Sequence, residues 1–181
     1  EERRWIEDID LQFSERPIPN YYILAGRSTK VDHVLHDGDE VLLEEGLSIH
    51  AYRTAGHSAG EMSYRLEDAF FIGDTVPVIT DIPIIIDVPE MIASIKMLRC
   101  QKGIRSFYPA WDHAYSAEEM KEKLEQAEEL IMNLGKAIAE SDVGQDLRDL
   151  TMLVSEEMKL QMFSENPLFA KTVGAFRKEW K

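Results

Sequence analysis

Between Glu40 and Ile72, short segments of alternating apolar and polar residues are separated by turn signals. This pattern is typical of short strands that are joined by tight turns. The connection Glu67-Asp68 is short enough for a tight hairpin. Four segments have the length and pattern of strands, namely residues 40–43, 47–53, 62–66 and 69–72. The region is therefore predicted to form an antiparallel β-meander.

Helical patterns dominate after the meander. Asp87 can cap a helix that has Pro89 in its first turn and that Gly103 can end. A capping-box pattern, Ser116-Ala117-Glu118-Glu119, begins a longer helix. The apolar stripe of that helix consists of Met120, Leu124, Ala127, Ile131 and Leu134. Other segments are expected to be helical over residues 1–13, 143–163 and 166–180, with a short strand over 104–108.

Strands followed by helices indicate an α/β protein of the α+β kind, with a mainly antiparallel sheet. The 181 residues can bury a sizeable core. We expect the chain to divide into a strand-rich unit, residues 1–115, and a C-terminal helical tail, residues 116–181. The apolar faces of the tail are expected to serve core packing, with a dimer interface or an active-site lid as alternatives.

Composition excludes some classes of partner. The formal charge is −14, from 20 basic and 34 acidic residues, which disfavours nucleic acid and an anionic membrane surface. The single cysteine, Cys100, cannot form an intramolecular disulfide, so a reducing, cytoplasmic compartment is expected. No apolar stretch approaches the length of a membrane span, and no secretory signal is visible.

Three segments place a possible metal ligand directly after a predicted strand. His57 lies in the loop Gly56-His57-Ser58-Ala59-Gly60, where glycines permit a close approach of the backbone to a ligand. Asp74 follows the apolar residues 69–72, and His113 follows the strand over 104–108. Imidazole and carboxylate are ligands that Zn²⁺ accepts in proteins. If these strand ends share one rim, the three side chains can converge on a cation.

The order strand, His loop, hairpin, Asp, helix, strand, His resembles the metallo-β-lactamase superfamily, in particular its glyoxalase-II-like branch. The resemblance covers roughly Val31 to Tyr115. It implies half of an αββα sandwich and a metal-dependent hydrolase of a small-molecule ester, thioester or lactone. It also implies a two-metal site for zinc, with iron or manganese possible.

Residue by residue, the resemblance makes His57 the third histidine of the first metal site. Asp74 becomes the carboxylate that bridges two metals, and His113 becomes the last histidine of the second site. Ser58, Thr75 and Asp112 are expected to orient these ligands through hydrogen bonds without binding the metal themselves. For Asp112 a partnership with His113 and a plain loop position both remain open.

The sequence also departs from the family. The His-x-His-x-Asp-His motif is absent, and Ala55 and Ala59 stand where the family often has prolines. His33, His36 and His50 are expected at the surface or in structural roles. The chain starts at Glu1 without an initiator Met, so we expect the C-terminal part of a longer enzyme, or else a natural half-domain. Alone it is expected to be inactive or to bind metal weakly.

Half of a sandwich leaves one sheet face without its partner. We therefore expect the strands between Val41 and Ile72 to expose an apolar face, through which the chain forms a homodimer or associates otherwise. A rearranged contact with the helical tail is the alternative. Two other functions remain open, a di-iron oxidoreductase and a non-enzymatic module for assembly.

Overall fold

The computed structural model describes residues 30–78 and 81–180. The chain forms two compact units, residues 1–34 and residues 35–181. Only residues 30–34 of the first unit are described, and Lys30 forms an exposed ion pair with Asp32 there. The helix expected over residues 1–13 lies outside the described residues. All elements discussed below belong to the second unit.

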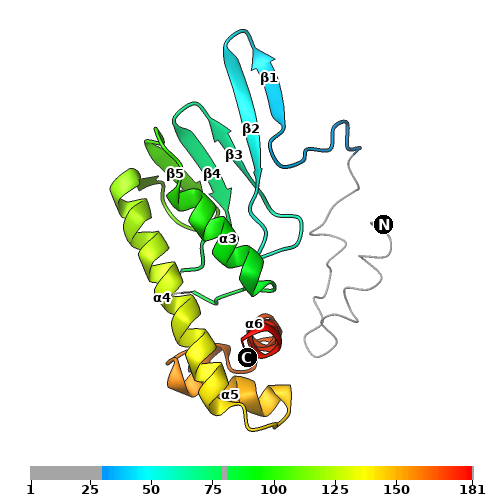
Figure 1. Cartoon of the computed structure of the whole chain (residues 1–181), viewed down its shortest axis with the longest axis vertical. Helices are drawn as coiled ribbons and strands as arrows, with labels where there is room; N and C mark the ends of the chain where they lie inside the picture. Colours follow the sequence, from blue (N-terminus) through cyan, green and yellow to red (C-terminus); the bar gives the residue numbers. More distant parts are fainter. Residues whose placement is uncertain (1–29, 79–80, 181) are drawn as a thin grey trace. The chain divides into compact units, whose positions relative to one another are not determined.

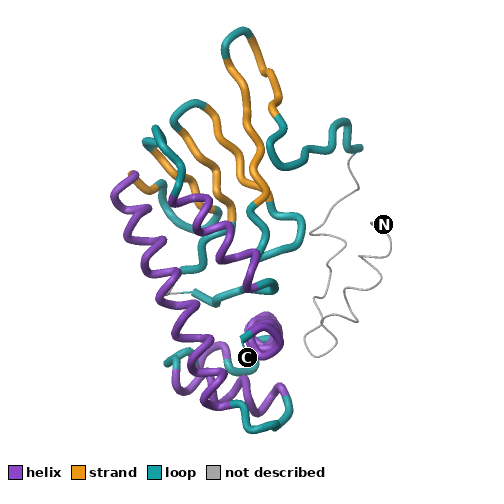
Figure 2. Tube along the Cα trace, in the orientation of Figure 1, coloured by secondary structure: helices purple, strands orange, loops and turns teal. Residues whose placement is uncertain are grey.

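The strands of the second unit form one sheet of six strands in the order β1-β2-β3-β4-β5-β6 (Figures 1 and 2). Neighbouring strands are antiparallel except β4 and β5, which are parallel. The strands are β1 (Glu40–Glu44), β2 (Leu47–Arg53), β3 (Met62–Leu66), β4 (Ala69–Gly73), β5 (Ser106–Pro109) and β6 (Tyr115–Ser116). The predicted meander is therefore confirmed, and the sheet is mainly antiparallel.

Helices follow β4 and dominate the chain after β6. They are α3 (Val88–Arg99), α4 (Ala117–Ser141), α5 (Leu147–Glu157), the 3₁₀ helix η1 (Gln161–Phe163) and α6 (Pro167–Glu179). The predicted caps are confirmed. Asp87 accepts a hydrogen bond from the Glu90 N–H, and Ser116 with Glu119 forms a complete capping box. Because these caps satisfy N–H groups left free at a helix start, they fix where α3 and α4 begin.

One helix prediction was wrong. The segment 143–163 is not a continuous helix, because α5 begins only after Asp146, whose side chain accepts from the Asp149 N–H. The helix ends at Glu157, and Lys159 has a positive φ of 58°. A left-handed residue cannot continue an α-helix, so the chain turns there and forms η1 instead.

The core lies between one face of the sheet and the helices. In β4, Phe70 and Ile72 are fully buried, whereas Phe71 between them is 43% exposed on the opposite face. The predicted stripe of α4 is buried throughout and joins the same core cluster as Phe70 and Phe176 of α6. The described residues thus show one hydrophobic core that spans strands and tail helices. The division at residue 115 remains a prediction.

The architecture agrees with the expected α+β class, a mixed sheet covered by helices. Among the described residues, no helix combines the length and apolar character needed to cross a membrane.

Candidate metal site

Loops that follow β2, β4 and β5 surround a cavity of about 730 Å³. His57 comes from the loop after β2, Asp74 directly follows β4, and Asp112 follows β5. The remaining wall is largely apolar and includes Val76, Ile82, Ile84, Trp111 and Tyr115. Two loops far apart in sequence therefore bring an imidazole and a carboxylate to one cavity.

The loop that carries His57 is docked against α3. Gly56 has φ +140°, and its carbonyl oxygen accepts hydrogen bonds from the N–H groups of Ile86 at 2.8 Å and Asp87 at 3.2 Å. The Ser94 hydroxyl donates to the carbonyl oxygen of Ala55 at 2.7 Å. These contacts fix the backbone on the N-terminal side of His57, so the position of the imidazole is set by the fold.

Three buried hydroxyl groups join the strand ends behind the cavity. Thr54, Ser63 and Thr75 are completely buried. The Thr54 Oγ1 lies 2.8 Å from the Ser63 Oγ and accepts from the Thr75 Oγ1 at 3.0 Å. Because buried hydroxyls need partners, this cluster holds the ends of β2 and β4 together beside β3.

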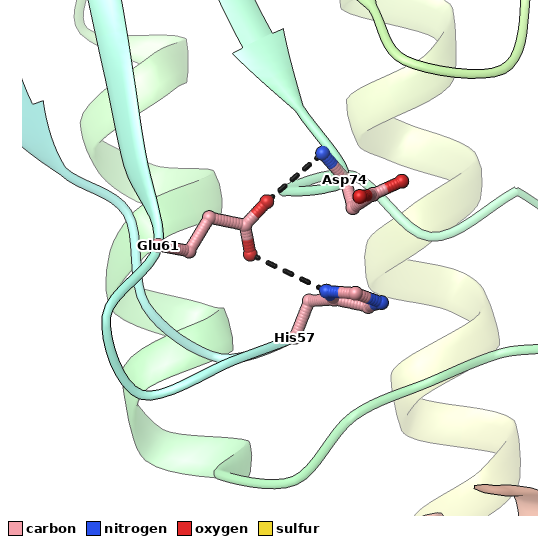
Figure 3. A group of neighbouring side chains, drawn as sticks. All are labelled: His57, Glu61 and Asp74. Carbon is pink, nitrogen blue, oxygen red and sulfur yellow. Dashed lines mark hydrogen bonds and ion pairs between the residues drawn. The ribbon is translucent and has the colours of Figure 1, made fainter. Parts of the chain in front are cut away.

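His57, Glu61 and Asp74 form the group that could hold a metal ion in the described part of the chain. Each offers one ligand atom, and these atoms lie within 4.8 Å of one another (Figure 3). The Glu61 Oε1 accepts a hydrogen bond from the Asp74 N–H at 2.9 Å. The Glu61 Oε2 lies 3.7 Å from the His57 Nδ1. One carboxylate thus contacts both of the expected ligands.

Burial shapes the charge states of this group. Burial lowers the pKa of His57, while the nearby Asp74 carboxylate acts in the opposite direction. Burial also raises the pKa of Glu61 to about 7, against the lowering effect of the Asp74 N–H. A lowered histidine pKa keeps the imidazole neutral near pH 7, which is the form that binds metals.

Asp112 organises the third loop. Its Oδ1 lies 2.7 Å from the His113 Nδ1 and also accepts from the His113 backbone N–H, while its Oδ2 accepts from the Tyr115 hydroxyl at 2.6 Å. The Tyr115 hydrogen bond is the largest cause that lowers the pKa of Asp112 to about 2. Burial and the Asp112 carboxylate together raise the pKa of Tyr115. Of the two alternatives left open for Asp112, this geometry favours the partnership with His113.

The structure brings some of the expected site residues together and leaves one aside. His57, Asp74 and Asp112 line the cavity, whereas Thr75 is buried next to Asp74 and donates to Thr54. The carbonyl oxygen of Ser58 closes the His57 loop by accepting from the Gly56 N–H at 3.4 Å. The His113 side chain is 66% exposed, lies between Asp112 and Glu119, and is not among the residues that line the cavity.

Glu61 was not predicted from the sequence. Its only signal is its position four residues after His57, at the end of the glycine-containing loop. A short loop between the antiparallel strands β2 and β3 carries both residues, so their spacing could have suggested a contact. The chain has 34 acidic residues, however, and the spacing alone does not select this one. His36 and His50, by contrast, are exposed as expected.

The donor set suits a divalent cation. It combines a neutral imidazole with carboxylate oxygens, and the ligand atoms lie within 4.8 Å of one another. The residues present therefore fit a metal ion at the cavity edge.

Structural similarity points to the same fold that the sequence pattern suggested. A metallo-beta-lactamase family protein from Thermus thermophilus aligns with 98% of this chain at a TM-score of 0.63 and 17% identity. An archaeal metallo-beta-lactamase superfamily protein from Sulfolobus tokodaii aligns with 97% of it at a TM-score of 0.54 and 19% identity. At this level of identity the similarity establishes the fold.

The chain spans only 59% and 63% of the lengths of these two proteins. No protein-family model matches the sequence, and no curated protein matches it. Any activity or substrate of this chain is therefore a proposal.

Proposed function

We propose that this chain, which has the metallo-β-lactamase fold, supplies part of the metal site of a hydrolase for small-molecule esters, thioesters or lactones. One observation carries the proposal. His57 and Asp74, which follow different strands, line one cavity whose other lining residues are mainly apolar, apart from Asp81 and Asp112. A polar, metal-binding edge beside an apolar wall suits a substrate with a hydrolysable carbonyl and an apolar acyl group.

Zinc in a two-metal site is the proposed cofactor. Bound cations would polarise the carbonyl oxygen of the substrate and activate water for attack. His57 and Asp74 would hold the metals, and His113, adjacent in sequence to the cavity-lining Asp112, would contribute to the second position. The Asp112 carboxylate would orient the His113 ring by accepting the Nδ1 proton.

The cavity wall has its own role in this proposal. Val76, Ile82 and Ile84 would contact the apolar part of the substrate and exclude water from it. Trp111, which is 84% exposed, also lines the cavity and would contact a bound molecule. A reducing, cytoplasmic setting is part of the proposal, because Cys100 is a free, exposed thiol.

The ligand set in this chain is incomplete for two metals. The sequence has no His-x-His-x-Asp-His segment, and the structure brings one histidine and two carboxylates within ligand distance of one another. We therefore propose that the chain alone binds metal weakly and that turnover needs additional ligands. Complete two-metal hydrolysis is proposed only where the missing ligands are supplied to this chain.

The test compares this chain alone with any longer protein in which the chain occurs. Zinc binding is followed by calorimetry, and hydrolysis is measured with a thioester, a lactone and an aryl ester. We expect weak zinc binding and background turnover for the chain alone, and zinc-dependent turnover where the additional ligands are present. His57→Ala and Asp74→Asn should abolish that turnover, whereas Glu125→Gln, an exposed change on α4, should not.

Several results would contradict the proposal. Zinc-independent turnover would show that hydrolysis does not need the metal. Unchanged zinc binding after His57→Ala combined with Asp74→Asn would show that these two residues do not bind it. Stoichiometric binding of two metals with full turnover by this chain alone would refute the incomplete ligand set. Metal analysis that finds iron, together with oxidase activity, would instead favour the di-iron alternative.

A further inference from the structure

We infer that Glu61 is a positioning residue whose single carboxylate orients both His57 and Asp74 toward the cavity. The inference rests on the proposed function for the identity of the two ligands, and it adds a residue that the expected ligand set does not contain. Four features of the structure support it.

The first feature is the contact with Asp74. The Glu61 Oε1 accepts the Asp74 N–H at 2.9 Å, which fixes the backbone directly after β4. A Cβ built on the preceding residue, Gly73, would lie 3.3 Å from the same Oε1. The carboxylate is therefore seated closely against the chain where β4 ends, and the glycine leaves room for it.

The second feature is the other oxygen of the carboxylate. The Glu61 Oε2 is buried and has no hydrogen-bond partner. The Nδ1 of His57 lies 3.7 Å away, and the side chain of Glu61 is only 10% exposed. An approach of roughly 0.8 Å by the imidazole ring would give a normal N–H···O hydrogen bond of about 2.9 Å. The Nδ1 proton of His57 is thus one donor within reach of this carboxylate, in addition to the Thr75 hydroxyl and the Ser58 N–H, which also lower the pKa of Glu61.

The third feature is the side from which Glu61 acts. His57 and Asp74 line the cavity, but Glu61 does not. Figure 3 shows the Nε2 of His57 and the Asp74 carboxylate on the side away from the Glu61 carboxylate. Glu61 therefore stands behind the two ligands rather than beside them, which favours a supporting role over direct coordination.

The fourth feature is the attachment of the loop. Thr54 at the start of the loop accepts from Thr75 in the buried hydroxyl cluster, and the Thr54 N–H donates to the carbonyl oxygen of Glu61 at 3.0 Å. The Glu61 backbone is therefore held in place independently of its carboxylate. A carboxylate mounted on a fixed backbone can define the orientation of an imidazole.

The chemical consequence concerns the tautomer of His57. A carboxylate that accepts the Nδ1 proton leaves the Nε2 lone pair free and directs it toward the cavity. Loss of such a supporting carboxylate lowers metal affinity by about 10- to 100-fold in known metal sites. The same loss would also release the backbone N–H of Asp74 from its partner.

Nitrogen-15 NMR of the whole metal-free chain tests the inference without any reliance on activity. Long-range ¹H–¹⁵N correlations, recorded at about pH 8 so that Glu61 is ionised despite its raised pKa, distinguish the Nδ1–H and Nε2–H tautomers of His57. We expect the Nδ1–H form in the wild type and a shift toward Nε2–H in Glu61→Ala. Glu61→Gln should give an intermediate result, because its one oxygen can accept from His57 or Asp74 but not both. Glu125→Gln on the exposed face of α4 is the charge-matched control.

Zinc calorimetry supplies the second readout. Glu61→Ala should weaken binding by about 10- to 100-fold, with an unchanged number of sites. An unchanged tautomer in both Glu61 variants would overturn the inference, as would a crystal structure of the zinc complex in which a Glu61 oxygen binds the metal. If the wild type binds no zinc, the proposed function fails, yet the metal-free tautomer still decides the role of Glu61.

Discussion

Gly56 packs so closely against Met91 of α3 that a Cβ on the glycine would lie 2.5 Å from the Met91 Cα. No side chain fits in that space, and the φ of +140° at Gly56 is one that residues with a side chain rarely adopt. The glycine therefore has two functions. It allows the loop to touch the helix, and it places the next residue, His57, at the cavity.

Replacement of Gly56 by alanine tests this contact. The methyl group would meet backbone atoms of α3 that cannot move without a shift of the helix. We expect a loss of about 2–4 kcal/mol in the free energy of unfolding, from steric overlap and backbone strain together. Urea denaturation measures it.

Gly60 in the same loop provides the matched control. A Cβ there would meet nothing within 4 Å, so Gly60→Ala should change stability by less than about 0.5 kcal/mol. Equal losses from the two alanine variants would show that the close approach to Met91 is not what constrains the loop.

The stability of the metal-free protein should depend on pH through Glu61. Between about pH 4.3, the ordinary pKa of a glutamate, and about 7, the folded state holds a proton that the unfolded chain has released. Stability therefore falls as pH rises through this window, and the loss is complete above it. The pKa difference corresponds to on the order of 3 kcal/mol.

Urea denaturation in the presence of a chelator, from pH 4 to 8, checks this dependence. In Glu61→Gln the decrease in the free energy of unfolding that Glu61 causes should disappear. The stability of this variant relative to the wild type should therefore increase as pH rises. The exposed Glu125→Gln should follow the wild-type curve. Parallel curves for Glu61→Gln and the wild type would mean that Glu61 ionises normally in the folded state.

The sheet face opposite the helices is expected to mediate association with a second copy of the chain. Phe71 and Tyr108 stack there with ring centroids 4.9 Å apart, and they are 43% and 39% exposed. Paired exposed aromatic rings on neighbouring strands are typical of a contact surface. We expect Phe71→Ser combined with Tyr108→Ser to shift a dimer toward monomer.

Light scattering over a range of concentrations measures that shift. Met162→Ser removes a side chain that is 82% exposed in η1, away from the sheet, and should leave association unchanged. A wild-type chain that is monomeric at every concentration, or a double variant that associates as strongly as the wild type, would contradict the prediction.

The amino-acid sequence was sufficient for most of the local structure and for the fold class. The alternation of apolar and polar residues along a strand and the capping residues of a helix are patterns that extend over only a few positions. The meander and the starts of α3 and α4 could therefore be predicted directly. The break after α5 was missed because the left-handed conformation of Lys159 has no signal in its residue type. The resemblance to the metallo-β-lactamase superfamily rested on the order of His57, Asp74 and His113, and the comparisons support that fold.

Only the tertiary structure decided which side chains meet. It joined Glu61 to His57 and Asp74, although the spacing of four residues from His57 was the only sequence signal that separated Glu61 from the many other acidic residues. It also placed the ring of His113 between Asp112 and Glu119 rather than on the cavity wall. Local patterns report interactions along one strand or helix, whereas these contacts depend on how the loops after β2, β4 and β5 pack together.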